Sequence, residues 1–220
     1  MDLKTKRALL HLIYPNRCPI CGSVIGAQDR FCTDCESRLT LYDDSFCPPE
    51  ADSFTAVYVY NGSVKPAIKL LKNGICGNAD YALGMALAEK LRKTDIISRC
   101  DMLVPVPMWK ADIRKRRYNQ SGLICRIISA ELGIPVCVEA VSKVRPTAPQ
   151  KLLDKQLRSI NLTGAFIAVP ELAAGKRIMM IDDICTTGST ISETASALRK
   201  AGAAEVHSAS CCKTLPDKKK

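Results

Sequence analysis

The chain alternates between short apolar runs and longer amphipathic stretches. The short runs are rich in β-branched, aromatic or other apolar residues, and they predict strands at residues 54–60, 101–106, 134–138, 178–181 and about 205–211. The amphipathic stretches predict helices around Ile68, Leu70 and Leu71 and at residues 81–91, 119–132 and 191–200. Gly133 and Gly202 are stop signals for the last two helices. Strands that alternate with helices predict an α/β fold with a mostly parallel sheet.

The run at residues 178–181 predicts where a ligand binds. Its four consecutive apolar residues favour a strand buried on both faces, as in parallel sheets. Asp182 and Asp183 follow at the carboxyl end, where open α/β sheets bind ligands. The next helix can hold an anion at its amino end. Between the carboxylates and that helix lie hydroxyl side chains and a glycine: Thr186, Thr187, Gly188, Ser189 and Thr190.

These residue types suit a sugar phosphate. Two adjacent carboxylates can accept hydrogen bonds from a ribose diol, while hydroxyls and backbone N–H groups can bind a phosphate. Gly188 lets the backbone come close to the ligand. Two simpler interpretations stay open: an Asp-Asp pair also occurs in metal and phospho-acceptor sites, and a Thr-Gly-Ser-Thr turn is a common helix cap.

Four cysteines near the amino end form two matched pairs. Cys18 and Cys21 are followed, ten residues later, by Cys32 and Cys35. Two residues between thiolates let each pair bind one ion from a tight turn, as in structural zinc sites. A redox pair and an iron–sulfur cluster are the alternatives. Because cysteine fills all four positions, we expect a closed, non-catalytic zinc site.

The loop at residues 182–190 resembles the phosphoribosyl-pyrophosphate (PRPP) loop of type I phosphoribosyltransferases, and in particular that of the ComF family. Residues 101–108, followed by Arg114, Arg116 and residues 118–120, resemble the family's Val-Pro-Val-Pro-Leu and Arg-Gly-Phe-Asn-Gln signature. Its central motif is resembled by residues 145–147, Gln150, Arg158, Asn161, Leu162 and residues 164–166. The resemblance runs from about Leu10 to Lys213, nearly the whole chain.

The resemblance implies a type I phosphoribosyltransferase-like fold and roles for its motifs. Asp182 and Asp183 would bind the ribose of PRPP, and residues 186–190 its phosphate, with magnesium accompanying PRPP. The pyrophosphate side would comprise Pro105, Val106, Pro107, Arg114 and Arg116, for which a solvated basic helix face is the alternative. A lid between the two loops would include Arg145, Gln150, Arg158 and Asn161.

The chain departs from the family pattern at two places. Arg117 stands where the family usually has glycine, and Tyr118 replaces the usual phenylalanine. Many relatives carry a further cysteine pair after the first four, whereas here Cys47 stands alone before two prolines. The second departure favours a single metal ion.

Length and charge add a domain division and a class of partner. The 220 residues suffice for one full domain and a small appendage, and a polar linker at residues 43–52 predicts an N-terminal helix and zinc module at residues 1–50 and an α/β domain at residues 51–220. An ordinary 47% of hydrophobic residues argues against disordered and fibrous classes. The net charge of +10 favours anionic ligands.

No run is long enough to span a membrane and no signal peptide is evident, so we expect a cytoplasmic protein. We also expect the N-terminal amphipathic helix to pack on the body of the protein.

Two functions from different classes follow. The first is a phosphoribosyltransferase that binds PRPP with magnesium and acts on an unknown acceptor. The second is a non-catalytic binding or adaptor module. ComF proteins are associated with natural competence, so the resemblance implies single-stranded DNA and a DNA-translocating helicase as partners. Neither His11, in the N-terminal helix, nor His207, in a predicted strand, is an evident general base, so whether the site turns over stays open.

Overall fold

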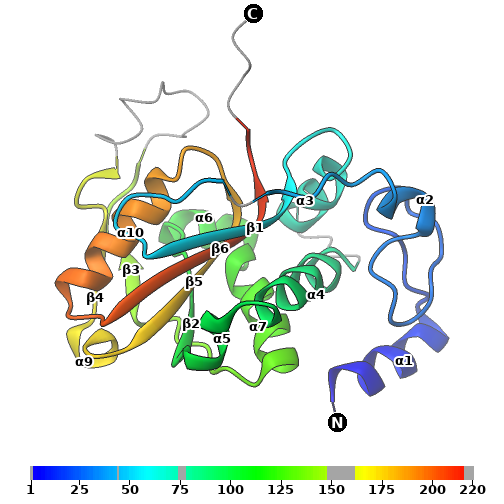
Figure 1. The fold of residues 1–220 in the computed structure, drawn as a ribbon. Helices are drawn as coiled ribbons and strands as arrows, with labels where there is room; N and C mark the ends of the chain where they lie inside the picture. The colour runs from blue at the N-terminus through cyan, green and yellow to red at the C-terminus, as the bar shows by residue number, and fades with distance from the viewer. Residues whose placement is uncertain (1, 44, 74–77, 148–161, 216–220) are drawn as a thin grey trace, which may run out of the picture.

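Four parallel strands form the centre of the molecule (Figure 1). The computed structural model describes residues 2–43, 45–73, 78–147 and 162–215. The sheet order is β1-β6-β5-β2, and all three pairs are parallel. The strands are β1 (Ser53–Val59), β2 (Met102–Pro105), β5 (Arg177–Cys185) and β6 (Glu205–Lys213). The predicted α/β fold with a mostly parallel sheet is therefore confirmed.

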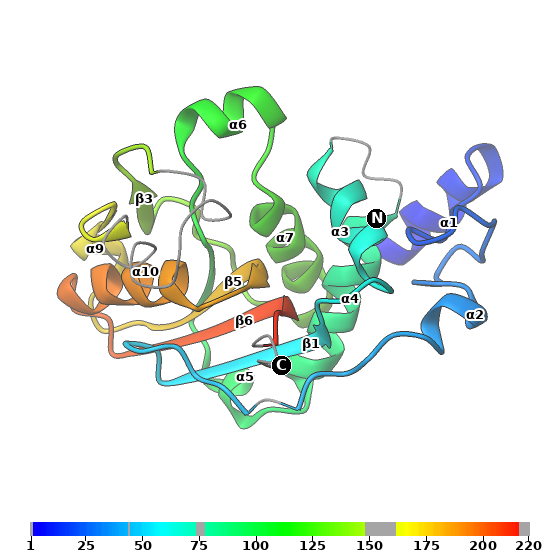
Figure 2. The same cartoon turned by 90° about the horizontal axis from the view of Figure 1, so that it is seen from above.

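Helices cover both faces of this sheet. The longer ones beside the sheet are α3 (Lys65–Lys72), α4 (Ala79–Arg92), α7 (Gln120–Leu132) and α10 (Ser189–Lys200). The remaining described helices are α1 (Leu3–Ile13), α2 (Thr33–Glu36), α5 (Asp95–Arg99), α6 (Lys110–Arg116) and α9 (Pro170–Ala173). Seen from above, α10 lies on one side of the sheet and α3, α4 and α7 lie on the other (Figure 2).

The alternation of side chains along β5 builds a hydrophobic core on each face. Met179 and Ile181 pack with buried residues of α3, α4 and α7, whereas Ile178 and Met180 pack with those of α10. Successive side chains of a strand point to opposite faces, so a strand buried on both faces has an unbroken apolar sequence. The apolar run of β5 therefore has the structural role that its sequence predicts.

The carboxyl-terminal part of β5 extends beyond its apolar run. Asp182 pairs with Ser210 and Ile184 with Cys212 of β6, so both carboxylates belong to the strand. The strand continues because the ladder with β6 satisfies its backbone groups as far as Cys185. The ladder thus holds the backbone of both carboxylates.

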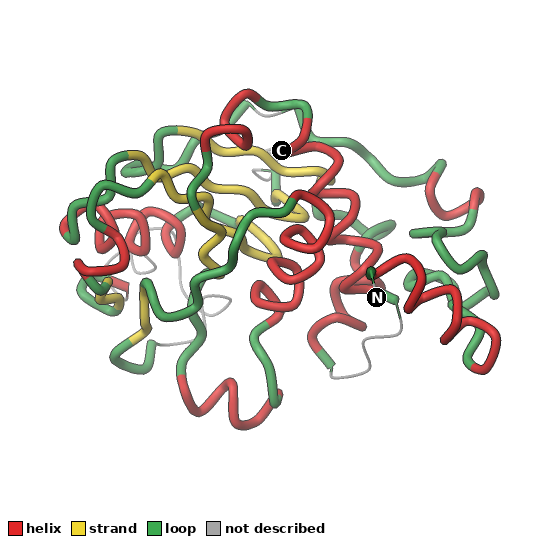
Figure 3. Tube along the Cα trace, turned by 90° about the horizontal axis from the view of Figure 1, so that it is seen from below, coloured by secondary structure: helices red, strands yellow, loops and turns green. Residues whose placement is uncertain are grey.

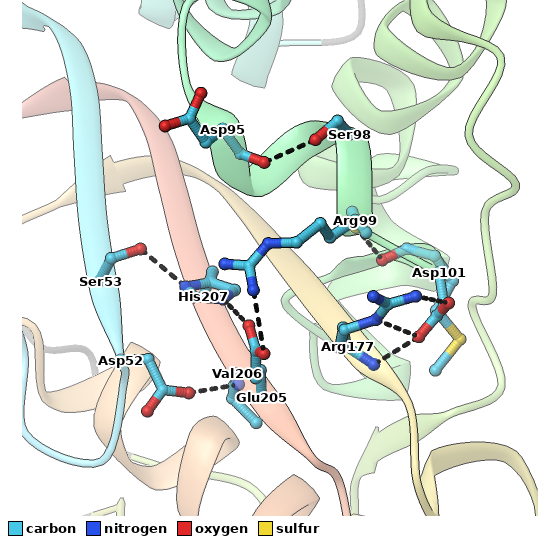
Figure 4. A network of polar contacts seen from close by, with 12 residues as sticks. Asp52, Ser53, Asp95, Ser98, Arg99, Asp101, Arg177, Glu205, Val206 and His207 are labelled. Atoms are coloured by element: carbon cyan, nitrogen blue, oxygen red, sulfur yellow. Dashed lines mark hydrogen bonds and ion pairs between the residues drawn. The ribbon is translucent and has the colours of Figure 1, made fainter.

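Polar side chains join the amino ends of the strands (Figure 4). His207 of β6 contacts Ser53 Oγ at 2.8 Å and Glu205 Oε2 at 2.8 Å, through its Nδ1 and Nε2 atoms. Before β2, Asp101 accepts hydrogen bonds from the backbone N–H and the guanidinium of Arg177. Because the strands are parallel, these contacts lie at the end of the sheet opposite Asp182. His207 therefore connects the edge strand to its neighbour, away from the candidate ligand loop.

The predicted strand at residues 134–138 is wrong. Within this segment Val136 alone forms a bridge, to Leu103 of β2. Leu103 N–H donates to Pro135 O, and Cys137 N–H donates to Leu103 O. Pro135 has no N–H, so one donor of a regular ladder is missing. Two short antiparallel strands, β3 (Val141–Lys143) and β4 (Phe166–Ala168), pair in a region for which the sequence predicted no strand.

The N-terminal helix forms as predicted, but its apolar side chains do not pack on the body. Leu9, Leu12 and Ile13 are exposed, Leu12 by 80%. The helix is attached instead through Arg7, whose guanidinium lies 3.4 Å above the ring of Tyr81. The side of the helix that carries Arg7 therefore faces the body, and Leu9, Leu12 and Ile13 face away from it.

The zinc module is mostly loop with one short helix, α2 (Figure 3). Its Cys18, Ile25, Phe31 and Cys35 belong to the same buried cluster as residues of α3 and α4. The apolar side chains of the zinc module therefore pack with helices that follow the linker at residues 43–52 in the chain. The boundary near residue 50 stays a prediction. No helix in the described part of the chain is long and apolar enough to cross a membrane.

Candidate functional site

Asp182 and Asp183 have different surroundings although they are neighbours. Asp182 Oδ1 accepts hydrogen bonds from Ser121 Oγ (3.1 Å), at the start of α7, and from the backbone N–H of Asp183 (2.8 Å). Asp183 Oδ2 lies 2.8 Å from Lys72 Nζ, at the end of α3. Each carboxylate therefore contacts a different helix terminus, Asp182 the start of α7 and Asp183 the end of α3.

These surroundings set the charge of the pair. Burial, followed by the negative charge of Asp183, raises the pKa of Asp182 to about 7. Burial opposes the ammonium charge of Lys72, but Asp183 outweighs it and raises the pKa of Lys72 above its ordinary value. Asp183 thus has a partner cation, whereas the pKa of Asp182 is raised above its ordinary value.

Residues 186–188 form the turn between β5 and α10, and residues 189 and 190 begin the helix. Gly188 has a φ of +84°, in the left-handed region that favours glycine, and α10 begins at Ser189. Thr187 Oγ1 and Ser189 Oγ lie 2.9 Å apart. N–H groups in the first turn of a helix have no intrahelical acceptor, so they can bind an anion.

A small pocket joins the loop to the first carboxylate. Its lining comes from the end of β5, the loop and the start of α10, namely Asp182, Ile184, Cys185, Thr186, Gly188, Thr190 and Ile191. Four of the predicted ribose and phosphate residues therefore share one pocket. Asp183 lies between two lining residues in the sequence but is not part of the lining, and its carboxylate contacts Lys72.

The predicted pyrophosphate side divides into two parts. Pro105 ends β2 and pairs with Ile181, and Val106 N–H donates to Ile181 O at 2.9 Å. These residues therefore lie beside the carboxylates. Arg114 and Arg116 lie on α6, which projects from the body in Figure 2 and buries none of its residues. Arg116 is near enough to Lys72 for its charge to oppose the rise in the pKa of that ammonium.

The lid prediction falls largely outside the described residues. Gln150, Arg158 and Asn161 belong to residues 148–161, which the structure does not describe. Arg145 is described, and its Nη2 donates to Thr163 O at 2.6 Å. It stands between β3 and β4, on the hairpin whose strands flank the lid segment in sequence.

Two polar partners of the carboxylates, Lys72 and Ser121, are not predicted by the sequence motifs. Lys72 and Ser121 lie 111 and 61 residues from the aspartates that they contact. Neither belongs to a motif with a mechanism of its own. Their only local signal is position, Lys72 in the last turn of a helix and Ser121 in the first, and this signal is too common to select them.

Arg117 adopts the conformation that explains the family's glycine. Its φ is +70°, and it caps α6, with its N–H donating to Ile113 O. A left-handed conformation costs an ordinary L-residue about 1–2 kcal/mol, and glycine avoids this cost. Arg117 therefore adds a positive charge at this position together with local backbone strain.

Replacing Arg117 with glycine should stabilise the protein by roughly 0.5–1 kcal/mol, because relief of the left-handed strain exceeds the added entropy of the unfolded chain. Urea denaturation measures the free energy of unfolding. The matched control, Arg114→Gly inside α6, should destabilise by up to about 1 kcal/mol. A lower stability of Arg117→Gly would contradict this account of the strain.

The four paired cysteines come together in space. Their sulfur atoms all lie within 4.8 Å of one another, and Cys21 Sγ is 3.6 Å from Cys32 Sγ. Zinc–sulfur bonds of about 2.3 Å in a tetrahedron place the sulfurs about 3.8 Å apart, so the cluster fits a zinc ion. The Ser23 hydroxyl, 3.3 Å from Cys21 Sγ, lowers the pKa of that thiol, whereas burial raises the pKa of Cys35 in the same cluster.

Comparison with known proteins places both parts of the chain in families. Residues 9–63 match a double zinc ribbon domain, and residues 118–220 match a phosphoribosyl transferase domain. The chain is 33% identical over 207 residues to the DNA utilization protein YhgH of Escherichia coli K12, covering 90% of each chain. The chain belongs to the ComF/YhgH family. The resemblance in the motifs is thereby confirmed.

Two further members of the ComF/YhgH family have names related to competence. Competence protein F of Haemophilus influenzae is 27% identical over 215 residues, which are 91% of each chain. Competence protein ComFC of Bacillus subtilis is 27% identical over 209 residues, which are 90% of this chain and 78% of that protein. Within the zinc ribbon match, Cys47 is the fifth cysteine and has no C-x2-C partner, so the match carries one four-cysteine cluster.

Proposed function

We propose that this protein binds PRPP, or a closely related sugar phosphate, together with magnesium. The observation that carries the proposal is the pocket that joins Asp182 to the loop before α10. Asp182, whose carboxylate can bind ribose hydroxyls, and residues of the first turn of α10, whose N–H groups can bind a phosphate, line the same small pocket. Membership of a family with a phosphoribosyl transferase domain supports the same ligand.

Magnesium suits the oxygen donors at this end of the sheet. It prefers carboxylate, phosphate and water oxygens, and the carboxylates of Asp182 and Asp183 are the donors that this chain offers beside the pocket. Bound with PRPP, the ion would neutralise charge on the pyrophosphate leaving group. Lys72 would have to share Asp183 with the ligand.

For an enzyme, the reaction class is displacement at the anomeric carbon of PRPP. An acceptor nucleophile would form a bond to that carbon while the bond to pyrophosphate breaks. The side chains around the pocket would orient the ribose and the phosphate, and the acceptor is unidentified. Calorimetry with PRPP and magnesium tests binding, and pyrophosphate release across a panel of nucleobases and amines tests turnover. Wild-type protein that binds no PRPP at millimolar concentration would overturn the proposal.

The second proposed ligand is single-stranded DNA, held by the exposed cations of α6. The names of the relatives refer to DNA utilization and competence, and both ligands would place the protein in the cytoplasm, where a DNA-translocating helicase would be a partner. The structural support is the projecting helix itself. The cations on and beside it are exposed, and they are Lys110, Arg114, Lys115, Arg116 and Arg117.

We expect single-stranded DNA to bind with a steep salt dependence, with a log–log slope of about −0.7 for each neutralised phosphate. Arg114→Glu/Arg116→Glu should weaken binding and reduce the slope. Fluorescence anisotropy with a labelled oligonucleotide at several salt concentrations measures both.

The matched control for DNA binding is Lys4→Glu/Lys6→Glu, which makes the same change of charge on exposed residues of α1. If DNA binding is equal in both double variants, α6 is not the DNA surface. Displacement of DNA by PRPP with magnesium would show that the two ligands share the cations of α6.

A further inference from the structure

The side chain of Lys213, the last residue of β6, contacts the loop between β5 and α10. Lys213 is 5% exposed, and its Nζ donates to Thr186 O at 2.6 Å and to Thr214 O at 2.7 Å. Thr186 opens the loop that follows β5. A buried ammonium is costly unless it is paired or hydrogen-bonded, so these carbonyls are the reason that the charge is tolerated.

The linker from the zinc module covers the same side of the loop. A Cβ atom on Gly188 would lie 2.9 Å from Phe46 Cζ and 3.1 Å from Pro48 Cβ, so both side chains rest against the glycine. The ring of Phe46 lies 4.4 Å from Lys213 Nζ. It also packs edge-on against Phe54 of β1, with 5.8 Å between centroids. Phe46 thereby shields the ammonium and joins the loop to the sheet.

The hydrogen bond from Lys213 to the Thr186 carbonyl fixes the direction of the peptide group between Thr186 and Thr187. In a trans peptide the C=O of one residue and the N–H of the next point in opposite directions. The Thr186 carbonyl points to Lys213, so the Thr187 N–H points away from it. The pocket is lined by β5, the loop and α10, with Lys213 and Phe46 outside its lining. Lys213 and Phe46 therefore contact the loop without forming part of the pocket lining.

We propose that Lys213 and Phe46 are positioning residues, which fix the peptide between Thr186 and Thr187 so that its N–H is directed to a phosphate in the pocket. The inference rests on the proposed function for the identity of the ligand, but the orientation of the peptide is a property of the unliganded protein. The linker that leads from the zinc module would then stabilise the loop between β5 and α10, through the contacts of Phe46 and Pro48 with Gly188.

The first test measures the loop without ligand. Lys213→Met keeps the length of the side chain and removes the donor, whereas Lys213→Arg keeps a cationic donor. In nuclear magnetic resonance spectra, the Thr186 carbonyl ¹³C and Thr187 amide ¹⁵N resonances should shift in Lys213→Met and return toward wild type in Lys213→Arg. The matched control Lys200→Met, at the far end of α10, should leave both unchanged. Unchanged loop resonances in Lys213→Met would overturn the proposal.

The second test measures affinity. Lys213→Met and Phe46→Ala should each weaken PRPP with magnesium by about tenfold, the equivalent of about 1.4 kcal/mol, while Leu41→Ala, an exposed residue of the preceding chain, should have no effect. Tighter binding by Phe46→Ala would show that the linker obstructs the pocket and would overturn the supporting role. Failure of the wild-type protein to bind PRPP would contradict the proposed function alone, because the resonance test does not require PRPP.

Discussion

Replacement of Asp182 and Asp183 by asparagine should weaken PRPP binding in the presence of magnesium by roughly ten- to hundredfold for each lost charge-assisted hydrogen bond, at about 1.5–3 kcal/mol per bond. Asparagine keeps the shape of the side chain and one oxygen but removes the charge that a cation and a ribose diol require. Isothermal titration calorimetry measures the affinity. Asp95→Asn, on α5 at the other end of the sheet, is the matched control and should bind as wild type.

The affinity of the wild type should also rise with pH. The raised pKa of Asp182, about 7, means that its carboxyl is mostly protonated at pH 6 and ionised at pH 8. Since the ionised form binds the ligand, the dissociation constant should fall across this interval in wild type and stay flatter in Asp182→Asn. Equal affinity of wild type and the double variant, or a wild-type affinity independent of pH between 6 and 8, would place the ribose elsewhere.

The second large effect concerns zinc. Protein purified without chelators should contain one zinc ion per chain, and Cys18→Ser/Cys35→Ser should remove it. Structural zinc contributes about 10–16 kcal/mol of apparent binding energy in small zinc modules, and here Cys18 and Cys35 are also part of the core shared with α3 and α4. We therefore expect a lower melting temperature for the whole protein as well as loss of metal.

Elemental analysis and thermal unfolding measure the two consequences of losing zinc. Cys47→Ser is the matched control, because Cys47 lies outside the four-sulfur cluster and donates to the carbonyls of Pro48 and Ala51. It should keep both the metal and the melting temperature. Retention of zinc by the Cys18/Cys35 double variant, or a content well below one in wild type, would contradict the four-thiolate site.

The features that sequence predicts best are those whose parts are neighbours in the chain. The loop at residues 182–190 and the pairs Cys18/Cys21 and Cys32/Cys35 each carry their chemistry within a short segment. The apolar run of β5 likewise contains its own evidence for burial on two faces. In these cases local spacing and local chemistry are sufficient.

The contacts that tune the site depend on tertiary packing. Lys72 contacts Asp183, and Lys213 contacts Thr186, only because the fold brings the end of α3 and the carboxyl ends of β5 and β6 together. No spacing rule relates such residues. The same cause explains why β3 was missed, because a three-residue strand depends on its partner rather than on a pattern. The wrong strand at residues 134–138 has a local cause instead, since Pro135 limits a run that composition favours as a strand.

The sheet order has a consequence for biosynthesis. The first strand of the sheet pairs with the last, with Ser53 opposite His207 and Val59 opposite Lys213, so β1 has no neighbour in this sheet until β6 has left the ribosome. Contacts between such distant residues form slowly, because a long loop must close before they are made. The four cysteines, by contrast, span residues 18–35 and are complete early in translation. A nascent chain would therefore acquire its metal long before its ligand loop, and loss of residues after Val206 would leave the metal module without a finished sheet to pack against.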